Sequence, residues 1–524
     1  MLERIYPEYM QSLFTNREKE LRLLELIKEK VITGKPARIS FFGLRRIGKT
    51  MILKESLKRC LKAKSGIKGA YLNFEEFTTS PEDFALNYVG RTCFWTLGGK
   101  QLETYLIPEK LLISVPEEIK DDVSNFLIML RDEKVNRTNL LNFAFGFPSL
   151  LSIKLNIKIM MLLDEFQKIL ELKRFRGCKN VISLFRGKIE AKNVGYMIAG
   201  SAISIMHDMV SNNRSPLFNQ FREESIEYFD KIASRELIRK LIRCDIKTKD
   251  VIYKLSNGHP FYINAIASRV NILNSLFEMK IDIELVKRAY VIEALSSKGD
   301  IYKHCEYIYD VSLERAKYGN SLKAVLKILT NKPGLNQSEL ARRLKITQGA
   351  VRTYLNELIN VDLLVEKDNQ YFFKDQILRY WLSYRELGTE LSEKPREKVL
   401  YELVRDLEER YLRASSELGR AKEHEFKSRL EDRYGLKLSN YLSKDGQIEL
   451  DLIGRKGRTT YIFEIKWRNK PSNYKDIKKF FEKVKSSEFK GKKRMFFAAK
   501  SFTDGARKYA GRSGVELIEE IAAI

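Results

Sequence analysis

The chain has 524 residues, enough for three or four domains at roughly 150 residues per domain. Lys and Arg number 95 against 69 Asp and Glu, so the formal net charge is +26, and 44% hydrophobic residues exclude a chain that is disordered throughout. No apolar run approaches the ~20 residues that span a bilayer, and the N-terminus lacks the pattern of a secretory signal. The five cysteines form no C-x-x-C pair, which indicates neither a disulfide framework nor a zinc site. We therefore expect a soluble cytoplasmic protein and no membrane partner.

The excess of positive charge favours a polyanionic partner, most often a nucleic acid, and we expect DNA. The alternative is a lysine-rich surface typical of thermophiles, which needs no nucleic acid. A homo-oligomer and a protein partner are left open.

The first half of the chain alternates short apolar runs with helical patterns, which indicates βαβ units and a parallel sheet. Strands are predicted at 37–42, 69–74, 157–163 and 194–199, with a helical insertion between 88 and 154. Residues 231–317 are predicted to be helical. A helix-turn-helix with a hairpin is expected near 320–375, and mixed α/β structure after about 398.

A glycine-rich loop follows the first predicted strand directly. The segment Gly43-Leu-Arg-Arg-Ile-Gly48-Lys49-Thr50 matches G-x-x-x-x-G-K-[ST], and helix-forming residues come next. Strand, glycine loop and helix together predict a loop whose backbone N–H groups surround a phosphate. Lys49 is expected to reach the β- and γ-phosphates of ATP, and the Thr50 hydroxyl to ligate Mg²⁺. The predicted nucleotide-binding residues are Gly43, Leu44, Arg45, Arg46, Ile47, Gly48, Lys49, Thr50 and Met51.

Polar residues end two further predicted strands. Asp164 and Glu165 follow a continuous apolar run, so Asp164 is expected to hold Mg²⁺ and Glu165 to polarise the attacking water. An Asp at this point is also a helix N-cap, which is compatible with that role. Ser201 ends the next strand and is interpreted either as a γ-phosphate sensor or as a simple N-cap.

Five stretches together resemble the archaeal ATPase family, in the signal-transduction (STAND) branch of the AAA+-like P-loop ATPases. They are Phe14-Thr-Asn-Arg17, the glycine loop, Leu162-Leu-Asp-Glu-Phe166 with Ala199-Gly-Ser201, and Asn257-Gly-His-Pro260. The resemblance implies that Arg17 lies against the adenine and that Pro260, in a helical lid, contacts the nucleotide. One departure is Gln220, where the family commonly has an arginine. Loss of an arginine finger costs on the order of 10³-fold, so slow turnover is expected.

The segment 320–375 has the pattern of a winged helix. Two helices are predicted on either side of a short turn, and a hairpin after them is expected to form the wing. Four polar residues of the second helix are expected to face DNA, namely Thr347, Gln348, Arg352 and Thr353. The alternative is a winged helix that serves only to pack against the ATPase.

Two alternating strands are predicted around 446–467. Asp451 falls on the first strand, and Glu464 and Lys466 fall on one face of the second. Carboxylates at neighbouring strand ends can share Mg²⁺, and a lysine beside them can orient the attacking water. This arrangement resembles the PD-(D/E)xK nuclease superfamily, in which an upstream helical glutamate is usual, and Glu423 is favoured over Glu425 for that place. The alternative is a nuclease fold that has lost its activity.

The sequence thus predicts a multidomain α/β protein. We expect a P-loop ATPase core with a parallel sheet (14–230), a helical lid (231–317), a winged helix (318–376) and a restriction-endonuclease-like domain (398–524). Its predicted function is an ATP-hydrolysing switch that acts on DNA and cleaves it with Mg²⁺. The rival prediction is a signalling ATPase whose C-terminal domains only bind DNA or a protein.

Overall fold

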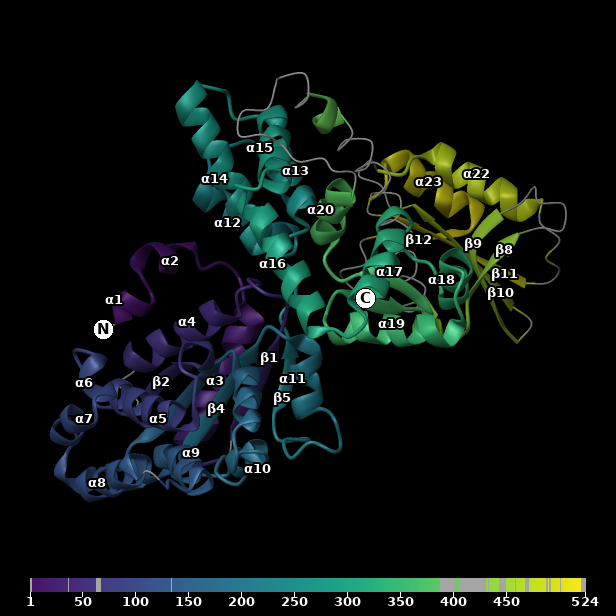
Figure 1. Cartoon of the computed structure of the whole chain (residues 1–524). Coiled ribbons are helices and arrows are strands. Elements are labelled where there is room, and N and C mark those ends of the chain that lie inside the picture. The colour runs from purple at the N-terminus through teal and green to yellow at the C-terminus, as the bar shows by residue number, and fades with distance from the viewer. Residues whose placement is uncertain are drawn as a thin grey trace. The chain divides into compact units, whose positions relative to one another are not determined.

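The computed structural model describes residues 2–35, 37–62, 67–132, 134–386, 401–405, 430–431, 433–442, 449–457, 459–466, 471–486, 489, 492–499 and 501–519. The chain divides into two compact units, Met1–Leu400 and Tyr401–Ile524, and each is described by itself (Figure 1).

A parallel five-stranded sheet in the order β2-β3-β4-β1-β5 forms the centre of the first unit. Four of its strands lie where the apolar runs predict them, and their buried residues explain why each run is continuous rather than alternating. The fifth, at the edge of the sheet, has the charged sequence Arg-Glu-Glu-Ser and was not predicted. The strands are β1 (Arg38–Phe42), β2 (Ile67–Asn73), β3 (Lys158–Asp164), β4 (Val194–Gly200) and β5 (Arg222–Ser225).

Helices cover both faces of this sheet. The helices α3 (Glu18–Ile32) and α4 (Lys49–Lys62) pack together and against β3 and β4. The predicted insertion between β2 and β3 is confirmed as a set of helices that pack on one another, and right-handed crossovers place it on the face opposite α4. It comprises α5 (Pro81–Thr96), α6 (Glu103–Leu106), α7 (Pro108–Ser114), α8 (Glu117–Arg131) and α9 (Arg137–Lys154).

Shorter helical elements complete the ATPase part of this unit. Two 3₁₀ segments follow β2 and β3, and short helices precede α3 and connect the later strands. They are α1 (Leu2–Ile5), α2 (Glu8–Leu13), η1 (Phe74–Glu76), η2 (Phe166–Arg174), α10 (Val181–Arg186) and α11 (Ile203–Val210).

Five helices follow the sheet, as the sequence predicts for 231–317. They are α12 (Lys231–Leu241), α13 (Ile246–Ser256), α14 (Pro260–Phe277), α15 (Ile283–Leu295) and α16 (Asp300–Arg315). The helices α12, α13 and α15 all contact α14, so α14 is the central helix of this helical part.

The winged-helix pattern is also confirmed. Its helices are α17 (Gly319–Asn331), α18 (Gln337–Leu344) and α19 (Gln348–Asn360), and its wing is the hairpin of β6 (Leu364–Lys367) and β7 (Gln370–Phe373). Asp368 and Asn369 connect the two strands with φ values of 51° and 61°, as a two-residue type I′ turn requires. The helix α20 (Gln376–Glu386) follows the wing.

The second unit contains a mixed five-stranded sheet in the order β12-β11-β10-β9-β8. The predicted hairpin is its β9 (Glu449–Lys456) and β10 (Thr459–Lys466), and β11 (Lys492–Ala499) and β12 (Val515–Glu519) add parallel neighbours. The remaining strand is β8 (Ser439–Leu442). One apolar cluster of this unit includes residues of α22 (Tyr474–Lys485) and α23 (Asp504–Ser513), and a separate cluster includes Leu430, Leu436 and Leu438.

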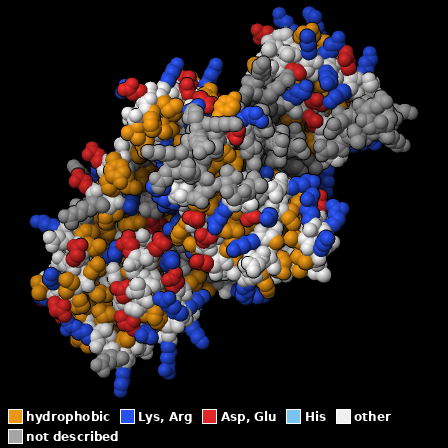
Figure 2. Space-filling model, turned by 45° about the horizontal axis from the view of Figure 1, so that its top comes forward, with side chains coloured by type: hydrophobic (Ala, Val, Ile, Leu, Met, Phe, Trp, Pro, Cys, Tyr) orange, Lys and Arg blue, Asp and Glu red, His pale blue; other side chains and the backbone are white. Residues whose placement is uncertain are grey.

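No helix in the described part of the chain is both long and apolar enough to cross a membrane. All five cysteines are free thiols. On the face that Figure 2 shows, Lys and Arg side chains are interspersed with Asp and Glu side chains. The net charge of +26 therefore does not appear on this face as one uniform basic field.

Candidate functional site

The loop between β1 and α4 has the backbone that a phosphate-binding loop needs. Gly48 has a φ of +110°, which side-chain-bearing residues rarely adopt. A Cβ on Gly43 would come within 2.9 Å of the carbonyl oxygen of Ile226, so this position is too close to a neighbouring strand end for a larger residue. Ile47 points into the core, so only its backbone remains for a phosphate. The loop thus leads directly into the N-terminus of α4, where the first backbone N–H groups of a helix can bind an anion.

Lys49 is the first residue of α4 and is almost wholly buried. Its Nζ donates to the carbonyl oxygens of Gly43 and Leu44, at 2.7 and 2.8 Å. Burial lowers the pKa of Lys49 to about 8, opposed by the charges of Glu165 and Asp164. The ammonium group is therefore held inside the loop, where a triphosphate would add negative charge to that of Glu165 and Asp164.

Thr50 and Asp164 lie in contact at the carboxyl end of β3. Thr50 Oγ1 donates to Asp164 Oδ2 at 2.7 Å, and the Tyr71 hydroxyl of β2 donates to the same oxygen at 2.9 Å. Burial raises the pKa of Asp164, while the bonds from Thr50 and Tyr71 oppose the shift. A hydroxyl and a buried carboxylate at this spacing fit Mg²⁺, which prefers hard oxygen ligands.

Glu165 stands beside Ser201 at the same edge of the sheet. Ser201 Oγ donates to Glu165 Oε2 at 2.8 Å, and the Gln167 amide donates to that oxygen as well. Glu165 has a left-handed backbone, with φ 48° and ψ 44°, and caps η2 without a side-chain bond. The N-cap of α11 is Ala202, so Ser201 does not cap that helix. The structure thus brings together Lys49, Thr50, Asp164, Glu165 and Ser201.

Arg17 joins the loop to the chain that leads into the helical part. Its guanidinium donates to the carbonyl oxygens of Ile47 and Glu227, both at 2.9 Å, and lies 4.6 Å from the centre of the Phe229 ring. These contacts hold the loop backbone. That Arg17 lies against an adenine stays a prediction.

The side chains of Arg45 and Arg46 reach from the loop to the helical part. The Arg45 guanidinium lies 4.6 Å from the centre of the Tyr307 ring in α16, and that of Arg46 lies 4.3 Å from the ring of Phe261 in α14. Arg45 also lies 3.8 Å from Glu75. Both arginines therefore stack on aromatic rings of the helices that follow the sheet. Met51 is partly buried in α4.

His259, beside Pro260 at the start of α14, was not predicted as a site residue. Its Nδ1 accepts the N–H of Phe261, while its Nε2 is buried without a hydrogen bond, close to the backbone of Arg45. Burial lowers the pKa of His259 to about 3, so the ring is neutral at pH 7 and its Nε2 carries the proton. A buried donor thus faces the backbone of Arg45 in the loop, next to the first residue of α14, Pro260. The Asn-Gly-His-Pro stretch marks this place in the sequence.

Neither Gln220 nor the two arginines near it takes the place of the arginine that the family commonly has. Gln220 donates to the Phe218 carbonyl, and its own carbonyl accepts from Arg38. Arg214 is exposed, and Arg222 is paired with Glu224 at 3.0 Å. No arginine finger can be assigned from these positions.

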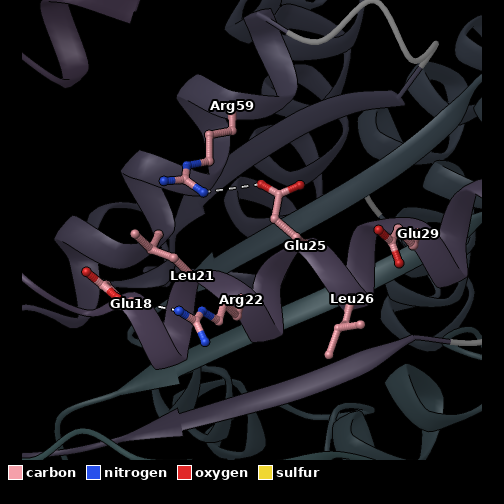
Figure 3. A pocket seen from close by; sticks show the side chains of 7 residues that line it. All are labelled: Glu18, Leu21, Arg22, Glu25, Leu26, Glu29 and Arg59. Carbon is pink, nitrogen blue, oxygen red and sulfur yellow. Dashed lines mark hydrogen bonds and ion pairs between the residues drawn. The ribbon is translucent and has the colours of Figure 1, made fainter.

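A surface hollow lies elsewhere, over the outer face of α3 (Figure 3). Glu18, Glu25 and Arg59 are among its lining residues, and Figure 3 shows Glu25 facing Arg59, its partner at 3.4 Å. None of the predicted site residues lines it. It is therefore separate from the loop that is predicted to bind ATP.

The winged helix presents a basic surface. Four exposed cations lie in α18, in the turn after it and in the first half of α19, and they have no ion pair within 4 Å in the described part of the chain. These cations are Arg342, Arg343, Lys345 and Arg352. All four predicted DNA-facing residues are exposed, but the Thr347 hydroxyl caps α19 and that of Thr353 bonds to the Gly349 carbonyl, which leaves the side chains of Gln348 and Arg352 for DNA. Arg352 is thus the best placed of the four.

In the second unit, the β9–β10 hairpin brings Asp451 next to Glu464. The register that pairs Leu452 with Phe463 puts these two carboxylates side by side at the end of the ladder. Asp451 Oδ2 accepts the N–H of Ile465 at 2.7 Å, and Glu464 Oε2 is buried without a hydrogen bond. Burial, then the charge of Asp451, raises the pKa of Glu464. An unsatisfied buried carboxylate oxygen beside a second carboxylate fits Mg²⁺.

Lys466 lies on the same strand but is paired with a residue that was not predicted. Its Nζ is 3.3 Å from Asp476 Oδ1 in α22, and Lys483 of the same helix lies 3.4 Å from Glu464 Oε1. Glu423 and its alternative Glu425 lie outside the described residues. Within the described ranges, no group of three or more His, Cys, Asp and Glu side chains is arranged to hold a metal ion.

Three family models match the chain. Residues 14–266 match an ATPase domain found predominantly in Archaea. Residues 320–364 match a winged helix-turn-helix DNA-binding domain, and residues 423–522 match a restriction endonuclease domain. These matches support the predicted resemblance and the fold class of all three parts. No match is found among curated proteins.

Several solved structures are similar to the chain. A Walker-type ATPase of Pyrococcus abyssi is 18% identical with a TM-score of 0.48, and the match covers 71% of this chain and 96% of that one. The ORC2 protein of Aeropyrum pernix, in ADPNP–ADP complexes, is 14% identical with a TM-score of 0.44, covering 71% and 94%. The RuvB Holliday junction branch migration motor of Thermotoga maritima is 12% identical with a TM-score of 0.36, covering 72% and 97%.

Proposed function

Because this chain carries an archaeal-type ATPase domain, a winged helix of the DNA-binding type and a restriction-endonuclease-like domain, we propose that it is an ATP-hydrolysing switch protein that acts on DNA and cleaves it. The observation that carries the proposal is a hydrogen-bonded connection from the ATPase sheet to the winged helix. It starts three residues after Ser201.

The ATPase half of the proposal rests on the residues at the carboxyl edge of the first sheet. Lys49 would bind the β- and γ-phosphates, and Thr50 and Asp164 would hold Mg²⁺, which supplies positive charge to the transferred phosphoryl group. Glu165 would orient the attacking water, and the Ser201 hydroxyl, which donates to Glu165, would sense the γ-phosphate. Water then attacks the γ-phosphorus and the bond to the β-phosphate oxygen breaks, giving ADP and phosphate.

The connection to the winged helix begins at α11. Ser204 Oγ donates to Asp362 Oδ1 at 2.9 Å and to the Ile359 carbonyl at 3.0 Å, and the Ser204 N–H also donates to the Asp362 carboxylate. Asp362 lies between α19 and the wing and is paired with Lys374 after the wing, at 2.7 Å. A shift of the Ser201 strand end would therefore be transmitted to both the recognition helix and the wing.

A second connection runs through the helical part. The His259 ring lies 4.5 Å from the Tyr262 ring, and the Tyr262 hydroxyl donates to Asp375 Oδ2 at 2.5 Å. Asp375 in turn accepts the N–H groups of Ile377 and Leu378 at the start of α20. Tyr262 and Asp375 are both buried, so this bond has little competition from water. It links the phosphate-binding loop to the helix that leads out of the winged helix.

The switch is tested by replacing Asp362 with Gly, which tolerates its φ of 64° and removes its contacts to Ser204 and Lys374. We expect the full-length protein to bind DNA with affinities that differ at least about fivefold between its ATP and ADP states. In Asp362→Gly this difference disappears, while ATP hydrolysis stays within about threefold of the unchanged protein. Fluorescence anisotropy with labelled duplex DNA in the presence of a non-hydrolysable ATP analogue or ADP measures both states.

Glu278→Gly is the matched control, because Glu278 is exposed and also has a left-handed backbone, with φ 52°. It should keep the nucleotide dependence. A dependence that survives in Asp362→Gly contradicts the proposed connection, and its absence from the unchanged protein contradicts the switch itself.

DNA contact through the winged helix is tested at Arg352. Removing one phosphate contact is expected to weaken DNA binding and to make the slope of log K against log salt shallower by about 1. Arg352→Ala should show both effects in anisotropy titrations between ~50 and ~200 mM salt, and Arg176→Ala, an exposed arginine of the ATPase part, should show neither. If the two variants lose affinity equally, the basic surface acts only as a diffuse charge and the proposed interface is wrong.

The cleavage half of the proposal rests on Asp451, Glu464 and Lys466. The two carboxylates would hold Mg²⁺, which supplies charge neutralisation at the phosphodiester, and Lys466 would orient the attacking water. Water attacks phosphorus, the P–O bond to one deoxyribose breaks and the leaving oxygen takes up a proton. The products are one hydroxyl end and one phosphate monoester end. The restriction-endonuclease match over 423–522 supports this chemistry at the level of the domain.

A further inference from the structure

The helix α22 places two charged side chains against the carboxylate pair of the second unit. Asp476 and Lys483 are seven residues apart, which is two helical turns, and so lie on one side of the helix. The same side carries the buried residues Ile477, Phe480 and Val484, which pack in one apolar cluster with Phe497 of β11. The positions of both charged groups relative to the sheet are therefore fixed by the core.

The two lysines of the site, Lys466 and Lys483, have different carboxylate partners. Asp476 lies 3.3 Å from Lys466, so the lysine of the predicted motif already has a carboxylate partner. Lys483 lies 3.4 Å from Glu464 Oε1, and the exposed fractions of their side chains are 29% and 8%. The ammonium group with a direct contact to the buried carboxylate of β10 is therefore that of Lys483.

The contact occupies one of the two Glu464 oxygens and leaves Oε2 without a hydrogen bond. A divalent cation bound between Asp451 and Glu464 would be close to this ammonium group, and the like charges repel each other. Lys483 therefore competes with the metal for Glu464. Its flexible four-carbon stem allows the ammonium group to move away from Glu464 while it stays near the site.

We propose that Lys483 is a further residue of the nuclease centre, which neutralises Glu464 in the absence of metal and binds the scissile phosphate of DNA once metal has taken its place. The inference rests on the proposed function, since it assigns a substrate contact at the proposed cleavage site.

The test uses Lys483→Met in the full chain, with Lys479→Met as the matched control on an exposed position of the same helix. The first readout is Mn²⁺ binding measured by calorimetry without DNA. Only the binding that is lost in Asp451→Asn is counted, because that binding belongs to the site in the second unit. Because a partly exposed competing cation is removed, Lys483→Met should bind Mn²⁺ about two- to fivefold more tightly. Lys479→Met should bind as the unchanged protein does.

The second readout is the cleavage of supercoiled plasmid with Mg²⁺. Lys483→Met should cut at least about tenfold more slowly than the control, because a charged contact to the phosphate is lost. Tighter metal binding with weaker cutting supports the proposal. Metal binding that is unchanged or weaker overturns it, and unchanged cutting overturns the phosphate contact.

The two readouts separate this inference from the proposed nuclease function. If the unchanged protein cuts no DNA, the proposed function fails, and with it the phosphate contact, whereas the Mn²⁺ titration still decides whether Lys483 competes for Glu464. Thermal unfolding of each variant identifies a folding defect. If Lys483→Met does not fold, Lys483→Gln, which keeps a polar head without the charge, replaces it in both measurements.

Discussion

Replacing Glu165 with Gln is expected to lower ATP hydrolysis by ~10²- to 10⁴-fold, the range for loss of a positioned general base. Gln keeps the size of the side chain and can still accept the hydroxyl of Ser201, so the local structure should persist. Nucleotide binding should be retained, because Lys49 is held by loop carbonyls and not by Glu165. Phosphate release measures hydrolysis, and calorimetry with Mg²⁺ and ATP measures binding.

The control for this substitution is Glu171→Gln in η2, six residues along the chain. Glu171 pairs with Lys168 at 2.8 Å, whereas Ser201 bonds to Glu165 and Lys49 to the carbonyl oxygens of Gly43 and Leu44. Its hydrolysis rate should stay within about twofold of that of the unchanged protein, since a surface ion pair contributes little. Hydrolysis in Glu165→Gln that falls by less than about threefold would show that another group activates the water.

Replacing Asp451 with Asn should abolish most DNA cleavage, by at least about 100-fold, because the metal loses a charged ligand whose contribution amounts to several kcal/mol. The Asn oxygen can still accept the N–H of Ile465, so the hairpin is preserved. ATP hydrolysis by Lys49, Asp164 and Glu165 should be unchanged, because those residues belong to a different compact unit. Nicking of supercoiled plasmid with Mg²⁺ or Mn²⁺ measures the loss.

Asp504→Asn is the companion variant, since Asp504 is exposed in the first turn of α23. It should cut at the same rate as the unchanged protein. If the unchanged protein cuts neither supercoiled, linear, single-stranded nor branched DNA, the chain is not a nuclease. The signalling ATPase that only binds DNA or a protein then becomes the better description.

The sequence predicts much of this fold because the strands of the first sheet are buried on both sides. β1, β3 and β4 read as uninterrupted apolar runs, and their bounds agree with the predictions to within one residue. β5 was not predicted, because only one of its four residues, Glu224, is buried and an edge strand therefore has no apolar run. Its pairing with β1 depends on contacts with that strand and not on its own sequence.

The candidate sites, too, could be predicted only in part. Motif spacing is enough to find Lys49, Asp164 and Asp451, because these residues sit at strand ends or helix starts that the local sequence defines. Their partners come from distant elements, and no spacing rule connects them. Tyr71 reaches Asp164 from β2, 93 residues away, and Lys483 reaches Glu464 from α22. The left-handed backbone conformation of Glu165 also cannot be predicted from the sequence, because no sequence pattern marks a glutamate that adopts it.

Arg17 shows that the ATPase cannot be defined by its sheet alone. It lies 21 residues before β1, yet it holds the carbonyl of Ile47 on one side and that of Glu227 on the other. A shortened fragment that starts at the first strand would lack this clamp between the loop and the chain leading into the helices. Any truncation meant to isolate the ATPase therefore has to begin upstream of Arg17.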